Sequence, residues 1–437
     1  IRDIGVTGVQ TCALPIWLYR LLFVPVLLVL APVYLLRMRK RGGYGPDFAQ
    51  RFGAHPELAP AVGRRRVWIQ AVSVGEMLAI GPLLRAIRAT GAEIYLTTTT
   101  STGRRIAVER HADLVAAIGY FPLDAWPFAA RAWRRIKPDV VILMEGERWP
   151  EHLRQAAVRG VPVISVNARL SDRTFARLRL LGRAARPCLD GITLHLAAAR
   201  QDASRLAALG VPADRIRSVG NLKLDVSIEP VPENEKLRLR AELGLRDGPV
   251  LLGSSTWPGE EAAMLNAWRG ARASGHAGSL LLVPRHAERR GEIEAMLRAA
   301  GVSFHLRSAG PAAGPVDVAV ADTTGELRRL TQLADLVFVG KSLPPHTEGQ
   351  TPVEAAALEK PLLFGPGMGN FRTIARELRE RGAALCVPDA GALTAAVRAL
   401  LSDPAKSNVM ASEAAAWHRE NQGALDRSLA EISRYLV

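Results

Sequence analysis

The stretch VWIQAVSVGEMLAIGPLL, residues 67–84, holds the pattern that predicts the fold. Residues 67–73 form a short apolar run, typical of a strand that is buried on both faces. Gly75 permits a tight turn, and Glu76 opens a segment whose apolar residues have helical spacing. A buried strand, a glycine turn and an amphipathic helix in this order form one unit of a parallel α/β sheet.

The same order recurs along the whole chain, which predicts an α/β protein with two doubly wound, Rossmann-like domains that face each other across a cleft. Residues 227–236, SIEPVPENEK, contain two prolines and no apolar periodicity, and they are the predicted linker. The domains are therefore expected at 42–226 and 237–437, and a last helical stretch is expected at about 411–437. The other predicted strands are residues 93–100, 140–147 and 161–169 in the first domain and 249–256, 279–285, 316–322, 334–342, 360–365 and 383–389 in the second.

Composition limits the partners of the protein. The 437 residues are 48% hydrophobic and 23% charged, as in folded proteins, and the net charge is +15. This excess fits a membrane surface, a phosphorylated substrate or a nucleic acid, and solvated basic helix faces explain it equally well. No dense basic tail is interleaved with aromatic residues, so we expect no nucleic-acid partner. The three widely spaced cysteines exclude a disulfide framework and a thiolate zinc site.

An apolar stretch near the N-terminus predicts a membrane anchor. Trp17–Leu36 contains one charge, Arg20, and is about as long as a membrane-spanning helix. The basic residues at 37–41 follow directly, which by the positive-inside rule places the rest of the chain on the cytoplasmic side of the membrane. Residues 17–41 are thus expected to form the anchor and its basic flank. A full span and a monotopic anchor fit equally well, and a buried core helix is the alternative.

Residues 1–16 precede this anchor and have a different character. VTGVQTCALPI, at 6–16, has no charge and no apolar periodicity, and it resembles the translation of a sequencing-adapter oligonucleotide. We therefore expect residues 1–16 to be a non-native leader. Cys12 then drops out of the cysteine count, which leaves Cys188 and Cys386.

Polar residues follow three predicted strands of the first half. Ser73 and Glu76 have the spacing of a capping box, or else Glu76 is a carboxylate placed to accept a proton from a hydroxyl. The turn TTTTSTG, at 97–103, could hold an anion at a helix N-terminus or could simply cap that helix. Glu145 and Glu147 leave a buried strand on the same side, and either a catalytic role or a salt bridge, for instance with an arginine such as Arg148, explains them.

The turns of the second half resemble a nucleotide site. Ser254, Ser255, Arg285 and Lys341 follow strand ends and could surround a phosphate, and Glu354 could accept hydrogen bonds from a ribose. The sequence contains no G-x-x-x-x-G-K-[ST], G-x-S-x-G, H-E-x-x-H or D-x-D motif. We therefore expect no metal ion and no cofactor.

Taken together and in order, the motifs resemble those of bacterial 3-deoxy-D-manno-octulosonic acid (Kdo) transferases of lipopolysaccharide biosynthesis, over about residues 17–430. The motifs that carry the resemblance are GGYGPDFAQRFG (42–53), WIQAVSVGE (68–76), TTTTSTG (97–103), E-x-E-x-W-P (145–150), VNARLSDRT (166–174), GNLKLD (220–225), GSSTWPGEE (253–261), VPRHAER (283–289), GELRRL (325–330), GKSL with P-x-E-A-A (340–356), KPLLFGP (360–366) and NF (370–371).

The resemblance implies a GT-B glycosyltransferase that transfers Kdo from CMP-Kdo, with inversion and without a metal, to the 6-hydroxyl of the anionic lipid A precursor lipid IVA at the inner membrane. It implies that Glu76 is the general base. The acceptor-side residues that it implies are Ser73, Gly75, Thr100, Thr102, Glu145 and Glu147. The donor-side residues that it implies are Lys223, Ser254, Ser255, Arg285, His286, Lys341, Ser342, Gln350, Glu354 and Asn370.

The chain departs from the family pattern at a few positions. Gln70 stands where many members have His, Gly146 and Arg148 alter the usual E-T-E-L-W-P, and residues 348–351 replace G-G-H-N. Two other functions remain open at this point. One is a membrane-associated GT-B enzyme that uses a UDP-sugar, and the other is a non-catalytic membrane scaffold with the same fold.

Overall fold

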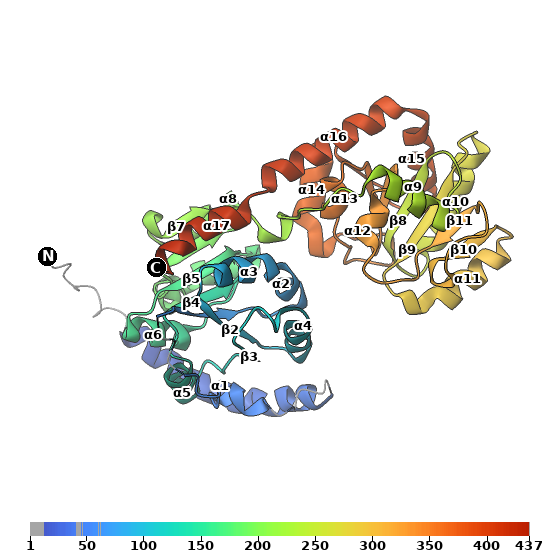
Figure 1. Ribbon diagram of the computed structural model, residues 1–437. Coiled ribbons are helices and arrows are strands. Elements are labelled where there is room, and N and C mark those ends of the chain that lie inside the picture. Colours follow the sequence, from blue (N-terminus) through green and yellow to red (C-terminus); the bar gives the residue numbers. More distant parts are fainter. Residues whose placement is uncertain (1–12, 41–44, 46, 60, 62, 437) are drawn as a thin grey trace. The chain divides into compact units, whose positions relative to one another are not determined.

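The computed structural model describes residues 13–436 apart from 41–44, 46, 60 and 62 (Figure 1). Most of the expected leader, residues 1–12, lies outside the described residues, as does residue 41 of the basic flank. Helix α1, Ala13–Lys40, runs through the expected boundary between leader and anchor at residues 16 and 17.

The chain divides into two compact units. Unit 1 comprises Ile1–Asp225 together with Gly423–Val437, and unit 2 comprises Val226–Gln422. The expected second domain, 237–437, therefore needs a correction, because the last segment of the chain packs on unit 1. The expected linker also differs from the structure, since helix α9 already begins at Glu233.

Unit 1 contains a seven-stranded sheet in the order β3-β2-β1-β4-β5-β6-β7, with every neighbouring pair parallel. The first six strands in this list follow the 3-2-1-4-5-6 order of dinucleotide-binding folds. The strand bounds are β1 Arg66–Gln70, β2 Glu93–Thr98, β3 Ala117–Tyr120, β4 Val140–Met144, β5 Val163–Ala168, β6 Leu194–Ala197 and β7 Ile216–Ser218.

Unit 2 contains a second seven-stranded parallel sheet in the order β10-β11-β9-β8-β12-β13-β14. Its strands are β8 Val250–Thr256, β9 Ser279–Pro284, β10 Phe304–Leu306, β11 Val318–Val320, β12 Leu336–Val339, β13 Leu362–Phe364 and β14 Ala384–Cys386. The ten strands expected from the sequence are confirmed in both units. The sequence did not predict β3, β6, β7 and β10, which have at most four residues each.

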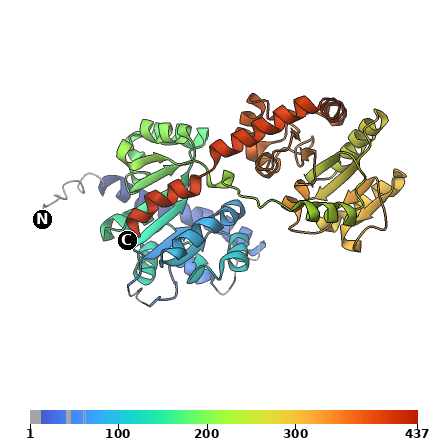
Figure 2. The same cartoon turned by 45° about the horizontal axis from the view of Figure 1, so that its top comes forward.

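Helices cover both faces of each sheet (Figures 1 and 2). In unit 1 these are α2 Val74–Ala79, α3 Gly81–Ala89, α4 Ser101–His111, α5 Trp126–Ile136, α6 Pro150–Arg159, α7 Asp172–Leu181, α8 Arg200–Ala208 and α17 Ala424–Ile432. In unit 2 they are α9 Glu233–Glu242, α10 Glu260–Ala273, α11 Arg290–Ala299, α12 Leu327–Thr331, α13 Val353–Ala357, α14 Arg372–Glu380, α15 Ala390–Ser402 and α16 Pro404–Asn421.

The burial pattern explains why these sheets have helices on both sides. In β1, Val67 and Ile69 belong to one hydrophobic cluster, and Trp68 between them belongs to another. All three side chains are fully buried. Because successive side chains of a strand point to opposite faces, an uninterrupted apolar strand requires cover on both.

The C-terminal segment returns to unit 1 through a break between two helices. The single helical stretch expected at 411–437 is in fact α16 and α17, separated by Gln422 and by Gly423, which has a φ of 78°. Asp225, at the end of the first segment of unit 1, accepts hydrogen bonds from the backbone N–H groups of Gly423 at 3.1 Å and Leu425 at 2.7 Å. This carboxylate therefore caps the N-terminus of α17 from a distant part of the chain.

Helix α1 contains Pro25 and Pro32 and packs its first turns against α6 and the 3₁₀ helix η2, Gly182–Cys188. Ile16 is buried there. Within the part of the chain that the structure describes, no helix is both long enough and apolar enough to cross a membrane. This finding does not support the membrane-spanning form of the anchor, and the anchor itself stays a prediction.

We predict that Asp225→Ala loosens α17 by about 1 kcal/mol, because two N–H groups of its first turn lose their acceptor. Hydrogen–deuterium exchange of the amides of residues 424–432 measures the effect and should be faster in the variant. Asp426→Ala is the matched control, since Asp426 is exposed in the same turn and should leave exchange unchanged. Equal exchange rates in the two variants would contradict the capping role of Asp225.

Candidate active site

The sheet of unit 1 has a switch point between β1 and β4, where the order of the strands changes direction. From β1 the chain continues to β2 and β3 on one side of the sheet, and from β4 it continues to β5, β6 and β7 on the other. In parallel α/β sheets, ligands bind outside the carboxyl ends of the strands at such a switch point. Glu76 follows β1, and Glu145 and Glu147 follow β4, so the carboxylates predicted from the sequence lie after the two adjacent strands of this switch.

Glu76 is buried in the first turn of α2 and is held by the segment that precedes it. Its Oε1 accepts a hydrogen bond from the Ser73 hydroxyl at 2.8 Å, and its Oε2 accepts one from the backbone N–H of Val72 at 2.9 Å. Ser73 in turn accepts the N–H of Glu76 at 3.1 Å. The expected capping arrangement therefore exists, and it also fixes the direction of a carboxylate at the end of β1.

Glu145 has a strained backbone and a close cationic partner. Its φ is 52°, a left-handed conformation that costs a residue with a Cβ about 1–2 kcal/mol. The ammonium of Lys223 lies 2.5 Å from its Oε1, and Asn167, with a φ of 55°, donates to the same oxygen at 3.4 Å. Asn167 also accepts the N–H of Leu222, so it links the end of β5 to the turn that carries Lys223.

Lys223, which the resemblance placed among the donor-side residues, lies in unit 1 and pairs with Glu145. Its contact with the donor stays a prediction. A Cβ placed on Gly75 would lie 3.9 Å from the Lys223 ammonium, so the α2 turn and the Lys223 turn are neighbours. Asn167 was not singled out from the sequence, although it lies within the quoted VNARLSDRT motif.

Glu147 is the carboxylate whose proton affinity changes most at this edge. The Trp149 indole N–H donates to its Oε2 at 2.5 Å. Burial, together with the negative charges of Glu76 and Glu145, raises the pKa of Glu147 from 4.5 to about 7. The Trp149 hydrogen bond and the positive charge of Arg148 act in the opposite direction. A carboxyl group with such a pKa exchanges protons near neutral pH.

The threonines expected on the acceptor side lie at the start of α4. Thr100 is the N-cap of this helix and accepts the N–H of Gly103 at 3.0 Å. Thr102 is exposed in the first turn. The capping interpretation of this turn is therefore confirmed, and contact with an acceptor stays a prediction.

Unit 2 has the same kind of switch between β8 and β12, which are adjacent strands. Ser254 and Ser255 lie near the end of β8, and Lys341 follows β12. Ser255 and Lys341 have left-handed backbones, with φ of 53° and 57°. Such conformations in residues other than glycine are often found at functional sites. The Lys341 ammonium lies 4.1 Å from the centre of the Trp257 ring and 3.3 Å from Glu348.

A buried carboxylate that the sequence analysis missed holds this edge together. Glu260 begins α10, and its Oε2 accepts the N–H groups of Trp257 at 2.9 Å and Lys341 at 2.7 Å. Its Oε1 accepts those of Ser342 at 2.8 Å and Leu343 at 3.0 Å. The loops after β8 and β12 are thus fixed on one side chain. The GSSTWPGEE motif contains this residue, but its role depends on a loop about 80 residues away in the sequence.

Ser342, expected on the donor side, has no exposed surface. Its hydroxyl donates to the carbonyl of Val339 at 2.5 Å and accepts the N–H of Gly365 at 2.8 Å. The hydroxyl therefore joins the loop after β12 to the end of β13, which leaves it no free surface for a ligand.

The other residues expected to bind the donor surround the same edge of unit 2. Arg285 follows β9 and is exposed, and within the described part of the chain it forms no ion pair. His286 contacts Glu288 at 3.1 Å, and Glu354 accepts a hydrogen bond from Arg328 at 2.7 Å. Gln350 is partly buried and Asn370 is exposed in the turn before α14. Among the described residues, no group of three or more His, Cys, Asp or Glu has a metal-binding arrangement.

The arrangement as a whole provides two kinds of chemistry on separate units. Unit 1 offers oriented carboxylates, one of them with a pKa near 7, beside a lysine. Unit 2 offers cationic side chains at strand ends, which suit a phosphate, and a carboxylate in a helix, which suits sugar hydroxyls.

The chain matches a family model described as 3-deoxy-D-manno-octulosonic-acid transferase (kdotransferase) over residues 46–226. It is similar to the 3-deoxy-D-manno-octulosonic acid transferase of Bordetella pertussis, with 37% identity over 424 residues that make up 93% of this chain and 97% of that protein. It is also similar to the 3-deoxy-D-manno-octulosonic acid transferase of Haemophilus influenzae, with 31% identity over 432 residues, 96% of this chain and 99% of that protein.

Among solved structures, the UDP-GlcNAc 2-epimerase from Neisseria meningitidis bound to UDP-GlcNAc has a TM-score of 0.56. Its sequence is 14% identical, and the match covers 84% of this chain and 100% of that chain. A likeness at this level of identity concerns the fold alone.

We predict that Glu147 makes folding stability depend on pH. Its pKa is about 7 in the folded state and 4.5 ordinarily, so between these values the folded protein binds more protons than the unfolded chain. Stability should therefore fall as pH rises from about 4.5 to about 7. Chemical denaturation of Glu147→Gln across this range should show a smaller decline.

Some decline should remain in that variant, because burial also raises the pKa of Asp124 to about 7. The matched control is Glu109→Gln, an exposed glutamate on α4 whose removal should leave the pH dependence as in the unmodified protein. An unchanged decline in Glu147→Gln would show that this carboxyl group titrates normally.

Proposed function

Because the chain belongs to the 3-deoxy-D-manno-octulosonic acid (Kdo) transferase family, we propose that it transfers Kdo from CMP-Kdo to the 6-hydroxyl of the phosphorylated lipid A precursor, lipid IVA. The family makes the protein a glycosyltransferase, and its paired parallel α/β sheets resemble the GT-B fold. The donor, the acceptor and the mechanism below are the proposal.

In the proposed reaction Glu76 is the general base. The acceptor hydroxyl attacks the anomeric carbon of Kdo, its proton passes to a Glu76 oxygen, and the bond between that carbon and the CMP phosphate oxygen breaks. CMP leaves with the bonding electron pair, and attack opposite to it inverts the anomeric centre. The observation that carries this role is the orientation of Glu76, whose two oxygens are held by Ser73 and Val72 at the end of β1. Each carboxylate oxygen keeps a further lone pair for the proton.

The neighbouring groups support this assignment. Glu147 lies close enough to Glu76 for the charge of one to affect the other, and it accepts a hydrogen bond from Trp149. Lys223 neutralises the charge of Glu145 next to them, which lowers the repulsion that an anionic acceptor would meet at this edge. We propose that Glu145 and Glu147 orient the acceptor sugar.

On the donor side we propose that cationic side chains perform the task that a metal ion performs in other sugar transferases. Arg285 and Lys341 would hold the CMP phosphate, with Ser254 and Ser255 beside them, and Glu354 would accept hydrogen bonds from the ribose. Fixed positive groups stabilise the charge that develops on the departing phosphate. Support comes from the exposed guanidinium of Arg285 and from the strained, well-held backbone of Lys341.

We further propose that α1 attaches the enzyme to the cytoplasmic leaflet of the inner membrane, where the acceptor lipid lies. Large apolar side chains are exposed along this helix, and contiguous patches of this kind mark membrane or protein contacts. The exposed apolar residues of α1 are Trp17, Leu18, Leu21, Leu22, Val26, Leu28, Val29, Leu30, Val33 and Leu36.

We predict that Glu76→Gln lowers the rate of Kdo transfer to lipid IVA by about 10²–10⁴-fold, the usual contribution of a general base. Binding of CMP, measured by calorimetry, should stay as in the unmodified enzyme and should be stronger than binding of UDP. Preference for UDP would overturn the choice of donor.

Ser73→Ala separates catalysis from helix capping in the same experiment. It removes the cap of α2 and one of the two hydrogen bonds that orient Glu76, but it keeps the carboxylate itself, so it should cost about 1 kcal/mol of stability and less activity than Glu76→Gln. Equal losses of activity in the two variants would reduce Glu76 to a capping residue.

We predict that replacing Leu28 and Val29 by Glu weakens association with anionic liposomes about tenfold or more, because both side chains are exposed on α1. Flotation of the protein with phosphatidylglycerol vesicles measures this. Leu180→Glu is the matched control, since Leu180 is an exposed apolar residue on α7 and should not affect flotation.

A further inference from the structure

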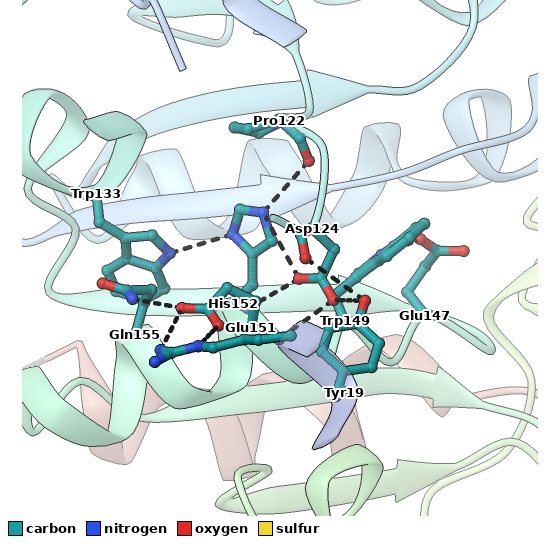
Figure 3. A network of polar contacts seen from close by, with 10 residues as sticks. Tyr19, Pro122, Asp124, Trp133, Glu147, Trp149, Glu151, His152 and Gln155 are labelled. Carbon is teal, nitrogen blue, oxygen red and sulfur yellow. Dashed lines mark hydrogen bonds and ion pairs between the residues drawn. The ribbon is translucent and has the colours of Figure 1, made fainter. Parts of the chain in front are cut away.

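Two adjacent polar residues, Tyr19 and Arg20, hold the first turns of α1 against the rest of unit 1, and Figure 3 shows the contact of Tyr19 with Asp124. The Tyr19 hydroxyl donates to Asp124 Oδ2 at 2.6 Å. The Arg20 guanidinium donates to both oxygens of Glu151, from Nε at 2.8 Å and from Nη2 at 3.1 Å. A helix that served only as a membrane attachment would need neither contact.

Asp124 accepts further hydrogen bonds besides the one from Tyr19. It lies before α5 and is almost fully buried, and it accepts the backbone N–H groups of Glu151 at 3.2 Å and His152 at 3.0 Å. These belong to the first turn of α6, whose own N-cap residue, Trp149, provides no side-chain acceptor. Asp124 is therefore the cap of α6, and Tyr19 holds this cap from the other side.

Glu151 depends on α1 in a different way. Its side chain has no exposed surface, and Arg20 is the cation with which it pairs among the described residues. Gln155 donates to the same carboxylate at 2.6 Å, but it carries no charge. A buried carboxylate requires such a partner, because ionisation in a dry environment is costly.

The remaining contacts make this turn rigid. The Nδ1 of His152 accepts the Trp133 indole N–H at 3.1 Å, so we assign the proton to Nε2, which donates to the Pro122 carbonyl at 3.3 Å. Burial lowers the pKa of His152 to about 3, which keeps this ring neutral. The ring packs on Phe121, with centres 4.4 Å apart.

The first turn of α6 lies directly beside the acceptor side of the candidate site. Trp149 immediately precedes α6. The centre of its ring lies 5.7 Å from that of Phe121, and its indole N–H donates to Glu147. The close view in Figure 3 shows Tyr19, Asp124, Trp149 and Glu147 in one neighbourhood. A shift of the first turn of α6 would therefore move Trp149 and, with it, the partner of Glu147.

We propose that Tyr19 and Arg20 are positioning residues for the acceptor side of the site. By seating α1 on Asp124 and Glu151, they hold the first turn of α6 and keep Trp149 in contact with Glu147. Helix α1 is then a structural support of the site in addition to its proposed role at the membrane. The kinetic part of the test rests on the proposed function, whereas the seating itself does not.

The test uses Tyr19→Phe and Arg20→Gln in the full chain, with a water-soluble acceptor, the deacylated phosphorylated glucosamine disaccharide. Membrane attachment does not contribute to this assay. We expect kcat/KM for the acceptor to fall about tenfold, as a small displacement of a positioned group does, with KM for CMP-Kdo unchanged. Arg20→Lys keeps the charge and should recover part of the loss. Val158→Ala, an exposed change on α6, is the control and should behave as the unmodified enzyme.

Hydrogen–deuterium exchange of residues 150–155 provides a second measurement that needs no activity. Exchange there should be faster in Tyr19→Phe and Arg20→Gln and unchanged in Val158→Ala. If the unmodified enzyme transferred no Kdo to the disaccharide, the acyl chains would be needed for transfer, and the exchange measurement would still test the seating. The positioning role would be overturned if both variants had the kinetics and the exchange rates of the unmodified enzyme. An equal loss of kcat/KM for CMP-Kdo and for the acceptor would also overturn it.

Discussion

Every strand of both sheets runs parallel to its neighbours, and the location of all chemistry in this protein depends on that constraint. Parallel strands bring their carboxyl ends to one edge of their sheet. Within unit 1 the polar turns after β1 and β4 therefore come together, and within unit 2 those after β8 and β12 do. The central strands, such as β1, β4 and β8, are buried on both faces and need helices on both sides. The loops at the carboxyl ends are then the places where polar side chains can gather.

Buried carboxylates that accept backbone N–H groups hold these loops in place. Glu260 fixes the loops after β8 and β12 with four such bonds, and Asp124 caps α6 from another element. Glu76 is held in the same manner and is also the proposed base. A buried carboxylate is stabilised by hydrogen bonds to its oxygens, so Glu260 and Asp124 each hold separate backbone segments in one arrangement, and Glu76 holds the turn that precedes α2. Rigid loops of this kind suit a reaction that depends on orientation.

Part of the candidate site was predictable from the sequence. Glu76, Glu145 and Glu147 follow predicted strands, and their common edge follows from the parallel sheet. The pairing of Lys223 with Glu145 was not predictable, because it depends on how the turn before residue 225 folds back onto β4 and β5. The contact of Tyr19 with Asp124 joins residues 105 positions apart, so no local sequence pattern predicts it.

The sequence by itself determined the α/β class, ten of the fourteen described strands, the capping of α2 and the family, because apolar periodicity and short turn motifs are local properties of the chain. The tertiary structure decided which unit receives the last helix, which carboxylates are buried and which cation each one meets. Asp225 draws residues 423–437 back to unit 1, and Asp124 draws α1 and α6 together. Such contacts form only when distant segments pack against each other and exclude water. Local sequence patterns therefore do not predict them.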